Sequence, residues 1–235
     1  AVMAEHGLRE PVLGLALDGV GLGSDGGIWG GELLWVDGAR FQRLGHLRPL
    51  PMPGGDRAAR EPWRMACAVL HALGSPDEAA RRFAHQPKVA QVLDMLARGT
   101  RCPPATSLGR CFDAAAALLG LCETMSFEGQ AAMRLETAAR AYGKALPLPG
   151  AYHIDRRAPD GPSVLNLYPL FKLLAEEGDP ARGAAHFHAS LVDGLVHWLA
   201  EAAHASGLRR VVLAGGCLHN RVLAAGLRHK LGARG

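Results

Sequence analysis

An aspartate and a group of glycines follow the first apolar segment of the chain. The apolar run covers residues 12–17, and Asp18 opens a stretch that ends at Glu32 and contains seven glycines. Glycine lets backbone N–H groups gather around an anion, and an aspartate at a strand end can bind a cation or handle a proton. The pattern predicts a phosphate- or metal-binding turn before a second strand at residues 33–36. The alternative is a glycine-rich β-hairpin without a ligand.

A second glycine pair lies near the other end of the chain. Gly215 and Gly216 follow an apolar run at residues 209–214 and precede a helix expected from Asn220 onward. Close approach to a ligand at this position requires glycine, and a helix N-terminus favours negative groups. The segment predicts a nucleotide-binding strand–turn–helix unit. The alternative is a tight turn in which Asn220 only caps the helix.

Charged residues also begin two helices that we expect in the middle of the chain. Arg110 and Asp113 start a helix that extends to about residue 122, and Glu128 precedes the next one. An acidic residue in a first turn is ordinary capping chemistry, so these residues alone do not select a ligand.

Three other side chains are weaker candidates. His186 and His188 are two residues apart on a helix, which is poor spacing for a shared metal ion. Cys217 beside the glycines is either a reactive thiol or a buried bystander, and the second reading is favoured.

Periodicity predicts the elements that must position these residues. Residues 12–50 are rich in strands, and prolines and glycines at 49–55 separate them from helical periodicity that begins at residue 60. The longest predicted helix carries Phe187, Leu191 and Leu195 on one apolar stripe. Together the elements predict an α/β fold. The later helices are expected at 77–84, 87–98, 110–122, 128–141, 169–177, 180–205 and 220–230, with a strand at 209–214.

Composition narrows the class of protein. With 235 residues, 49% hydrophobic and 20% charged, the chain has a globular composition. The net charge of +4 comes from scattered basic residues, which gives no support for a nucleic-acid partner. No apolar run is long enough for a membrane span, and five cysteines without a CxxC pair predict free thiols in a cytoplasmic protein. Both ends read as interior parts of a longer domain.

Taken in order, several runs resemble the HypF-type carbamoyltransferases of hydrogenase maturation, in their carbamoyl-transferring domain. The resemblance extends over essentially the whole chain. Its most specific runs are Ile28-Trp29-Gly30-Gly31-Glu32 and Arg60-Glu61-Pro62-Trp63-Arg64. The other matching runs are residues 17–21, 25–26, 53–56, 106–110, 112–113, 118–120, 128–132, 187–188 and 215–221.

The resemblance implies a fold. It is a two-lobed actin/Hsp70/sugar-kinase-like (ASKHA) carbamoyltransferase domain, here expected to be incomplete at both termini. Residues 1–56 would form the strand-rich part of the first lobe with its glycine loop. Residues 57–235 would form a helical segment and the second lobe, with its nucleotide-binding strand, Gly-Gly turn and helix.

The resemblance also implies ligands and site residues. The cofactors would be ATP or carbamoyl-adenylate and a divalent metal, iron or zinc, whose site would be incomplete because the family's histidine and Asp-Gly-Gly metal motifs are not in this sequence. Asp18 would be the metal ligand and, with Arg110 and Glu128, a catalytic residue. Residues near the phosphate or along the nucleotide would be Gly19, Gly21, Gly109, Asp113 and Gly129, with Gly215, Gly216 and Asn220 at the adenosine end.

The activity implied is transfer of a carbamoyl group from carbamoyl-adenylate, made in a separate domain, to the C-terminal cysteine thiol of HypE. This step leads to the cyanide ligands of [NiFe]-hydrogenase. The alternatives are a tRNA threonylcarbamoyl-transferase, a small-molecule O-carbamoyltransferase, or a non-catalytic module that binds HypE or nucleotide. We expect the 235 residues alone to be inactive.

Overall fold

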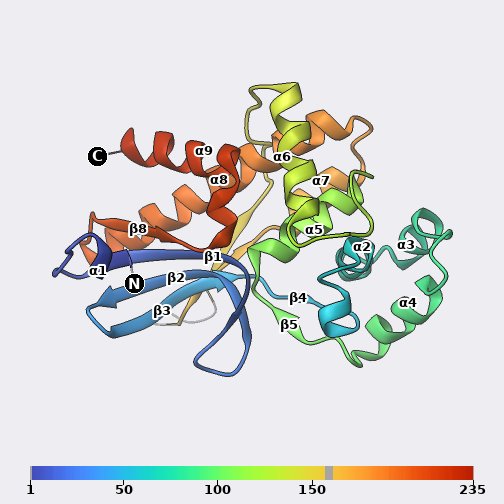
Figure 1. Ribbon diagram of the computed structural model, residues 1–235, viewed down its shortest axis with the longest axis horizontal. Helices are drawn as coiled ribbons and strands as arrows, with labels where there is room; N and C mark the ends of the chain where they lie inside the picture. Colours follow the sequence, from blue (N-terminus) through green and yellow to red (C-terminus); the bar gives the residue numbers. More distant parts are fainter. Residues whose placement is uncertain (1, 157–160, 235) are drawn as a thin grey trace.

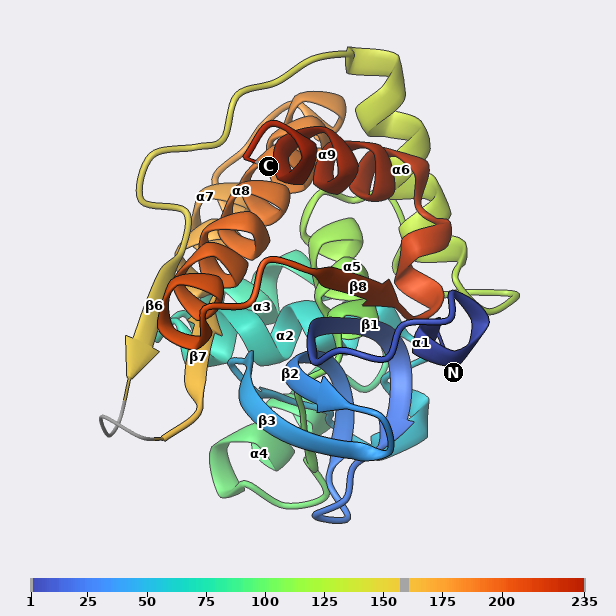
Figure 2. The same cartoon turned by 90° about the vertical axis from the view of Figure 1, so that its left-hand side faces the viewer.

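The computed structural model describes residues 2–156 and 161–234, whose strands form one mixed eight-stranded sheet (Figures 1 and 2). The sheet follows the order β4-β5-β2-β3-β7-β6, and β1 pairs with both β2 and β8. The predicted α/β class is confirmed. The strands are β1 (Val12–Leu22), β2 (Ile28–Asp37), β3 (Arg40–Leu47), β4 (Leu50–Pro51), β5 (Pro104–Ala105), β6 (His153–Arg156), β7 (Ser163–Asn166) and β8 (Val211–Ala214).

The helices agree with the periodicity to within a few residues. Prolines begin several of them, where the missing N–H is not needed. The helices are α1 (Val2–Glu5), α2 (Pro62–Ala72), α3 (Pro76–Arg82), α4 (Val89–Arg98), α5 (Leu108–Leu118), α6 (Gln130–Tyr142), α7 (Tyr168–Ala175), α8 (Pro180–Ser206) and α9 (Arg221–Gly232), with short 3-10 turns η1 (Gly55–Arg57) and η2 (Gly216–His219). None of the helices in the described part of the chain is both long and apolar enough to cross a membrane.

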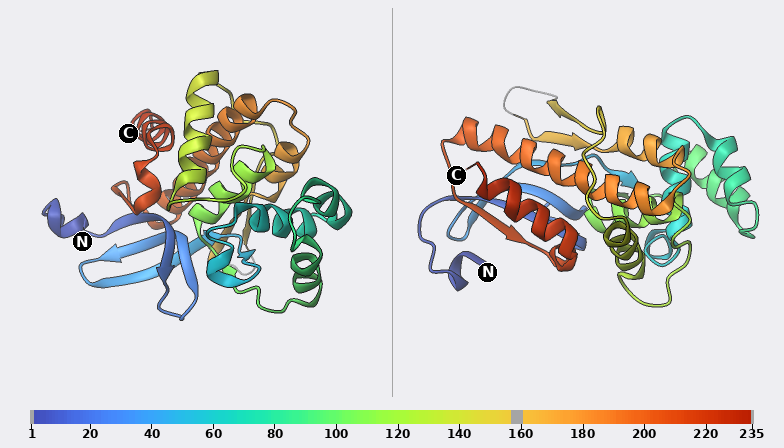
Figure 3. Two further views of the ribbon diagram at one scale, coloured as in Figure 1. Left: turned by 45° about the vertical axis from the view of Figure 1, so that its right-hand side comes forward. Right: turned by 90° about the horizontal axis from the view of Figure 1, so that it is seen from above.

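The long helix α8 is a central element of the core. Its side chains Phe187, Leu191 and Leu195 are fully buried, which confirms the predicted apolar stripe. Asp179 caps its first turn by accepting hydrogen bonds from two backbone N–H groups, and Gly207 ends it in a left-handed conformation. Figure 3 shows α8 lying beside α9, while α2, α3 and α4 gather at the opposite end of the molecule from the N-terminus.

The β1–β2 hairpin corrects one expectation from the sequence. We expected strands that stop at Leu17 and resume at residue 33, whereas the two strands continue through the glycines to the pair Leu22 and Ile28. The strands can approach closely because glycine has no side chain: a Cβ atom at Gly30 would lie 2.5 Å from the Asp18 carbonyl oxygen. The glycine-rich stretch is therefore mostly paired strand, and its turn is confined to residues 23–27.

A bulge interrupts this hairpin at the aspartate. Leu17 pairs with Gly31 and Gly21 pairs with Trp29, so that Gly30 alone faces the three residues 18–20 of β1. Extra residues on one strand bend it and redirect its side chains, and such bulges are frequent beside active sites. Asp18 comes directly after the buried residue Leu17 and takes the outward-facing place in the alternation of β1, at the start of the bulge.

Parallel pairing of β1 with β8 joins the two ends of the chain. The pairs run from Leu13 with Val211 to Ala16 with Ala214. Asp18 and Gly216 each lie two residues beyond the last of these pairs, so they are close together at the same end of the paired segment. Strands on both sides of residue 56 share the one sheet, and the division into lobes at that residue stays a prediction.

Candidate functional site

A cavity of about 370 Å³ opens beside the bulge of β1, where α5, α6 and the η2–α9 turn begin. Its wall includes most of the site residues predicted from the sequence, brought from four separate segments. The β1–β2 hairpin and the final strand–turn–helix unit therefore face one cavity. The predicted residues in the wall are Asp18, Gly19, Gly109, Arg110, Asp113, Glu128, Gly129, Gly216 and Asn220.

Two predicted glycines are not in this wall. Gly21 lies beyond the bulge, where it pairs with Trp29 in the hairpin. Gly215 has a φ of 106° and packs against β1, so that a Cβ atom there would be 2.1 Å from the Leu17 carbonyl oxygen. Close packing of the backbone explains the glycine at position 215, and the contact of both glycines with a nucleotide stays a prediction.

Asp18 is exposed at the cavity wall, and its Oδ1 atom accepts a hydrogen bond of 2.7 Å from the N–H of Gly19. Gly216 lies opposite, where a Cβ atom would be 3.2 Å from that same oxygen. A side chain at position 216 would crowd the carboxylate. The glycine at this position therefore keeps the approach to Asp18 open.

The metal ion implied by the resemblance can be tested against this donor set. Within residues 2–156 and 161–234, no group of three or more His, Cys, Asp or Glu side chains is arranged to hold a metal ion. Tight divalent sites need several protein ligands, and Asp18 is one carboxylate. The described residues do not fit a metal centre by themselves.

The N-terminus of α5 is fixed directly against β1. Ser107 caps the helix by accepting from the N–H of Arg110 at 3.2 Å, and its hydroxyl lies 3.1 Å and 2.5 Å from the carbonyl oxygens of Asp18 and Gly19. A Cβ atom at Gly109 would lie 2.6 Å from the Cα of Gly19, so the contact requires glycine. The helix end, with its partial positive charge, therefore faces the cavity and favours an anion.

A buried ion pair follows in the same helix. Arg110 Nε lies 2.6 Å from Asp113 Oδ2, and both side chains are almost fully buried. Burial raises the pKa of Asp113 to about 6, and the charge of Arg110 opposes that rise. Neither of these two atoms has a well-directed hydrogen bond among the described residues. Buried polar atoms of this kind are suited to a polar ligand or to water.

Asn220 combines capping with a place in the wall. Its Oδ1 atom accepts from the N–H of Leu223 at 2.9 Å, as the capping alternative predicted, and its Nδ2 atom lies 3.0 Å from Nε2 of His188. Reasoning from the sequence considered His188 only as a poor metal ligand and missed its contact with Asn220. The available signal was its position three residues before Leu191 on the buried stripe of α8.

The wall contains further residues outside the set predicted to form the site. Glu136 of α6 accepts a hydrogen bond of 3.3 Å from the N–H of Arg221, which joins α6 to the start of α9. The Cys217 thiol has its pKa raised to about 12, first by burial and then by the charge of Asp18. Because the thiolate is the nucleophile, this favours the bystander reading of Cys217. Other wall residues are Phe112, Ala132, Met133 and His219.

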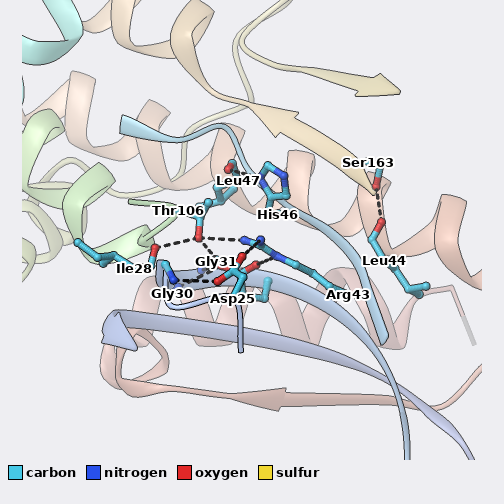
Figure 4. A network of polar contacts seen from close by, with 12 residues as sticks. Asp25, Ile28, Gly30, Gly31, Arg43, Leu44, His46, Leu47, Thr106 and Ser163 are labelled. Atoms are coloured by element: carbon cyan, nitrogen blue, oxygen red, sulfur yellow. Dashed lines mark hydrogen bonds and ion pairs between the residues drawn. The ribbon is translucent and has the colours of Figure 1, made fainter. Parts of the chain in front are cut away.

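The run from residue 28 to Glu32 has its own polar cluster, outside the cavity (Figure 4). Glu32 is buried; its Oε2 atom accepts from Arg43 Nε at 2.6 Å, and its Oε1 atom accepts from the N–H groups of Gly30 and Gly31 and from the Thr106 hydroxyl. The guanidinium of Arg43 stacks on Trp29 at 4.1 Å. Since Thr106 precedes the cap of α5, the cluster ties β2 and β3 to the helix that frames the cavity.

Comparisons with known proteins agree with this geometry. The family described as "Carbamoyltransferase, Kae1-like Domain, second subdomain" matches residues 14–235. The chain is 50% identical to "Carbamoyltransferase HypF2" of Cupriavidus necator over all of this chain and 32% of that protein. It is also 50% identical to "Carbamoyltransferase HypF homolog" of the same organism, over all of this chain and 61% of that protein. The chain thus spans less than two thirds of either relative.

A solved structure gives the same fold. A crystal structure of full-length HypF in the phosphate- and nucleotide-bound form superposes with a TM-score of 0.86 at 30% identity. The match covers 99% of this chain and 30% of that one. It includes the sheet and the helices that surround the cavity.

Proposed function

Because the chain belongs to the HypF carbamoyltransferase family, we propose that it contains the site of carbamoyl transfer. The group would pass from carbamoyl-adenylate to the C-terminal cysteine thiol of HypE, toward the cyanide ligands of [NiFe]-hydrogenase. The observation that carries the proposal is the cavity itself, in which Asp18, the N-terminus of α5 and the η2–α9 turn meet.

The cavity suits an adenylate in several respects. The N-terminus of α5 and Arg110 provide positive charge for a phosphate, and Gly19 and Gly109 leave the backbone accessible. Asn220 would lie toward the adenosine end, as the family resemblance implies. The related solved structure is described as phosphate- and nucleotide-bound, which supports nucleotide binding in the family, and we propose this cavity as the place of binding in this chain.

The proposed reaction needs little beyond placement and charge. A sulfur–carbon bond forms as the thiolate of the acceptor attacks the carbamoyl carbon, and the carbon–oxygen bond to AMP breaks. Charge develops on the carbamoyl oxygen and on the departing phosphate, where Arg110 and the α5 N-terminus can stabilise it. Asp18 and Glu128 would be the other catalytic residues, as the family resemblance implies. Asp18 remains a candidate ligand of a divalent ion whose other ligands are not among the described residues.

The proposed function can be tested by Asp18→Asn in a HypF protein that carries these residues. With synthetic carbamoyl-adenylate and HypE as substrates, we expect the rate of transfer to the terminal cysteine to fall by about 100-fold or more. The transfer is measured by mass spectrometry. Carbamoyl-adenylate formation, measured by pyrophosphate release, should continue. Because Asp18 is exposed, the free energy of unfolding should change by less than about 0.5 kcal/mol.

Asp25→Asn is the matched control, since Asp25 is another exposed aspartate of the same hairpin that accepts from a glycine N–H. It is not in the cavity wall and should retain transfer. Normal transfer by Asp18→Asn would contradict the assignment. Nucleotide binding without any transfer by the unmodified protein would instead favour the non-catalytic module.

A further inference from the structure

A neutral histidine lies directly behind the cavity wall. His188 is 2% exposed, and its ring packs against those of Phe112 and Phe187, with centroids 5.6 Å and 5.5 Å away. Its Nδ1 atom lies 2.8 Å from the carbonyl oxygen of Ala184, one turn earlier in α8. A carbonyl oxygen only accepts, so Nδ1 must carry the proton and Nε2 must be the acceptor.

This tautomer fixes the orientation of the Asn220 side-chain amide. Nε2 of His188 can only accept a hydrogen bond, and it lies 3.0 Å from Nδ2 of Asn220. The N–H of Leu223 can only donate, and it lies 2.9 Å from Oδ1 of Asn220. A flipped amide would place its oxygen against Nε2 and its NH₂ group against the Leu223 N–H. Both contacts would then be repulsive, so only one orientation of the amide satisfies both neighbours.

We propose that His188 is a positioning residue for the nucleotide site: it holds the Asn220 amide in the single orientation that the cavity wall presents to a nucleoside. The inference rests on the proposed function, in which the cavity takes an adenylate. A preoriented amide adds affinity because binding does not have to order it. His188 itself does not line the cavity, so its whole effect must pass through Asn220.

A histidine that merely fills the core would behave differently. Leucine at position 188 keeps an apolar group in the aromatic pocket and removes the acceptor, whereas glutamine keeps an acceptor oxygen near the place of Nε2. Packing alone predicts that both substitutions have similar effects on nucleotide affinity. The positioning role predicts that they differ.

The experiment measures AMP binding to the full chain by calorimetry. We expect His188→Leu to weaken AMP affinity about tenfold, the size of one lost neutral hydrogen bond, and His188→Gln to stay within about threefold of the unmodified chain. In an Asn220→Ala background, His188→Leu should have no further effect. The control is His186→Leu, because His186 lies on the same helix, is partly exposed and is not in the cavity wall.

Two results would overturn the inference. One is equal AMP affinity for the leucine and glutamine variants, and the other is additive losses in the double variant. If the unmodified chain does not bind AMP, the proposed function itself fails at this cavity, and the nucleotide role of His188 fails with it.

Nitrogen NMR gives an independent readout of the positioning. In the unmodified chain, His188 should show the Nδ1–H tautomer, and the Asn220 side-chain amide protons should exchange slowly with solvent. In His188→Leu that exchange should become faster. A protonated Nε2 at neutral pH would contradict the inference whatever the AMP result.

Discussion

Two buried polar clusters flank the start of α5, and they differ in how their charged groups are paired and in whether they line the cavity. Around Glu32, both carboxylate oxygens accept hydrogen bonds, and Arg43 has a carboxylate, a hydroxyl and an aromatic ring as partners. At the cavity, Arg110 Nε and Asp113 Oδ2 face each other without a well-directed hydrogen bond among the described residues.

The difference distinguishes two roles. The cluster of Glu32, Arg43 and Thr106 holds the hairpin on α5, and we call it the joint, whereas the cavity wall is a binding surface. Around Glu32 both carboxylate oxygens are engaged, although Trp29 Nε1 has no hydrogen-bond partner among the described residues, and breaking the cluster leaves a buried charge without a partner. Arg110 and Asp113 instead lie in the wall of the cavity, together with the start of α5. We therefore assign residues 28–32 to holding the hairpin on α5. We assign the cavity wall that contains Arg110 and Asn220 to binding the ligand. The family resemblance includes both regions and does not distinguish these two roles.

The largest effect that we expect tests the joint. Glu32→Ala would leave Arg43 without its buried partner and the N–H groups of Gly30 and Gly31 without an acceptor. We predict a loss of about 3 kcal/mol in the free energy of unfolding, measured by urea denaturation. AMP affinity of the molecules that remain folded should change less than about threefold.

Glu32→Gln keeps one acceptor oxygen, so its loss of stability should be clearly smaller. If Glu32→Ala were to weaken AMP binding strongly while stability stayed unchanged, the separation of joint from binding surface would be wrong.

The next prediction concerns His188, behind the cavity wall, and its effect on how folding stability depends on pH. Burial lowers the pKa of His188 to about 4, below the value of about 6.5 for an exposed histidine. Above pH 6.5 the ring is neutral in both states; as the pH falls toward 4, the unfolded chain takes up a proton that the folded state resists. The histidine therefore makes stability fall with decreasing pH, by up to about 1.4 kcal/mol per unit.

In His188→Gln this contribution is absent. The stability of the unmodified chain relative to the variant should decline between pH 6.5 and 4, as measured by urea denaturation at several pH values. Asp113 has the opposite sign, because its raised pKa makes stability fall as pH increases from about 3.8 through 6. That contribution is common to both proteins and cancels in the difference. Parallel pH profiles would refute the prediction.

The smallest effect is expected when a second ion pair is removed, one that joins the same two strands as Glu32 and Arg43. Asp37 and Arg40 pair at the turn from β2 to β3, where the Arg40 side chain is 79% exposed. Exposed pairs contribute little, so Arg40→Ala should cost less than about 0.5 kcal/mol in thermal or urea unfolding. A loss comparable to that of Glu32→Ala would show that burial does not distinguish the two pairs.

Local patterns in the sequence were sufficient for most of the elements. The apolar stripe of α8 and the cap at Asn220 follow from residue spacing, because helix periodicity and capping depend on neighbours within one or two turns. The family resemblance added the assignment of the cavity residues. The metal role of Asp18 and the catalytic roles of Arg110 and Glu128 stay predictions.

Only the tertiary structure decided what the glycines and His188 do. Whether a glycine approaches a ligand or another strand depends on what lies opposite, and for Gly215 that is Leu17, nearly two hundred residues away in the chain. Likewise, the acceptor role of His188 exists only because Asn220 is packed against it. Residue types determine which contacts are chemically possible, but the pairing of β1 with β8 and of α8 with α9 determines which of them form, because those contacts join segments that no local pattern connects.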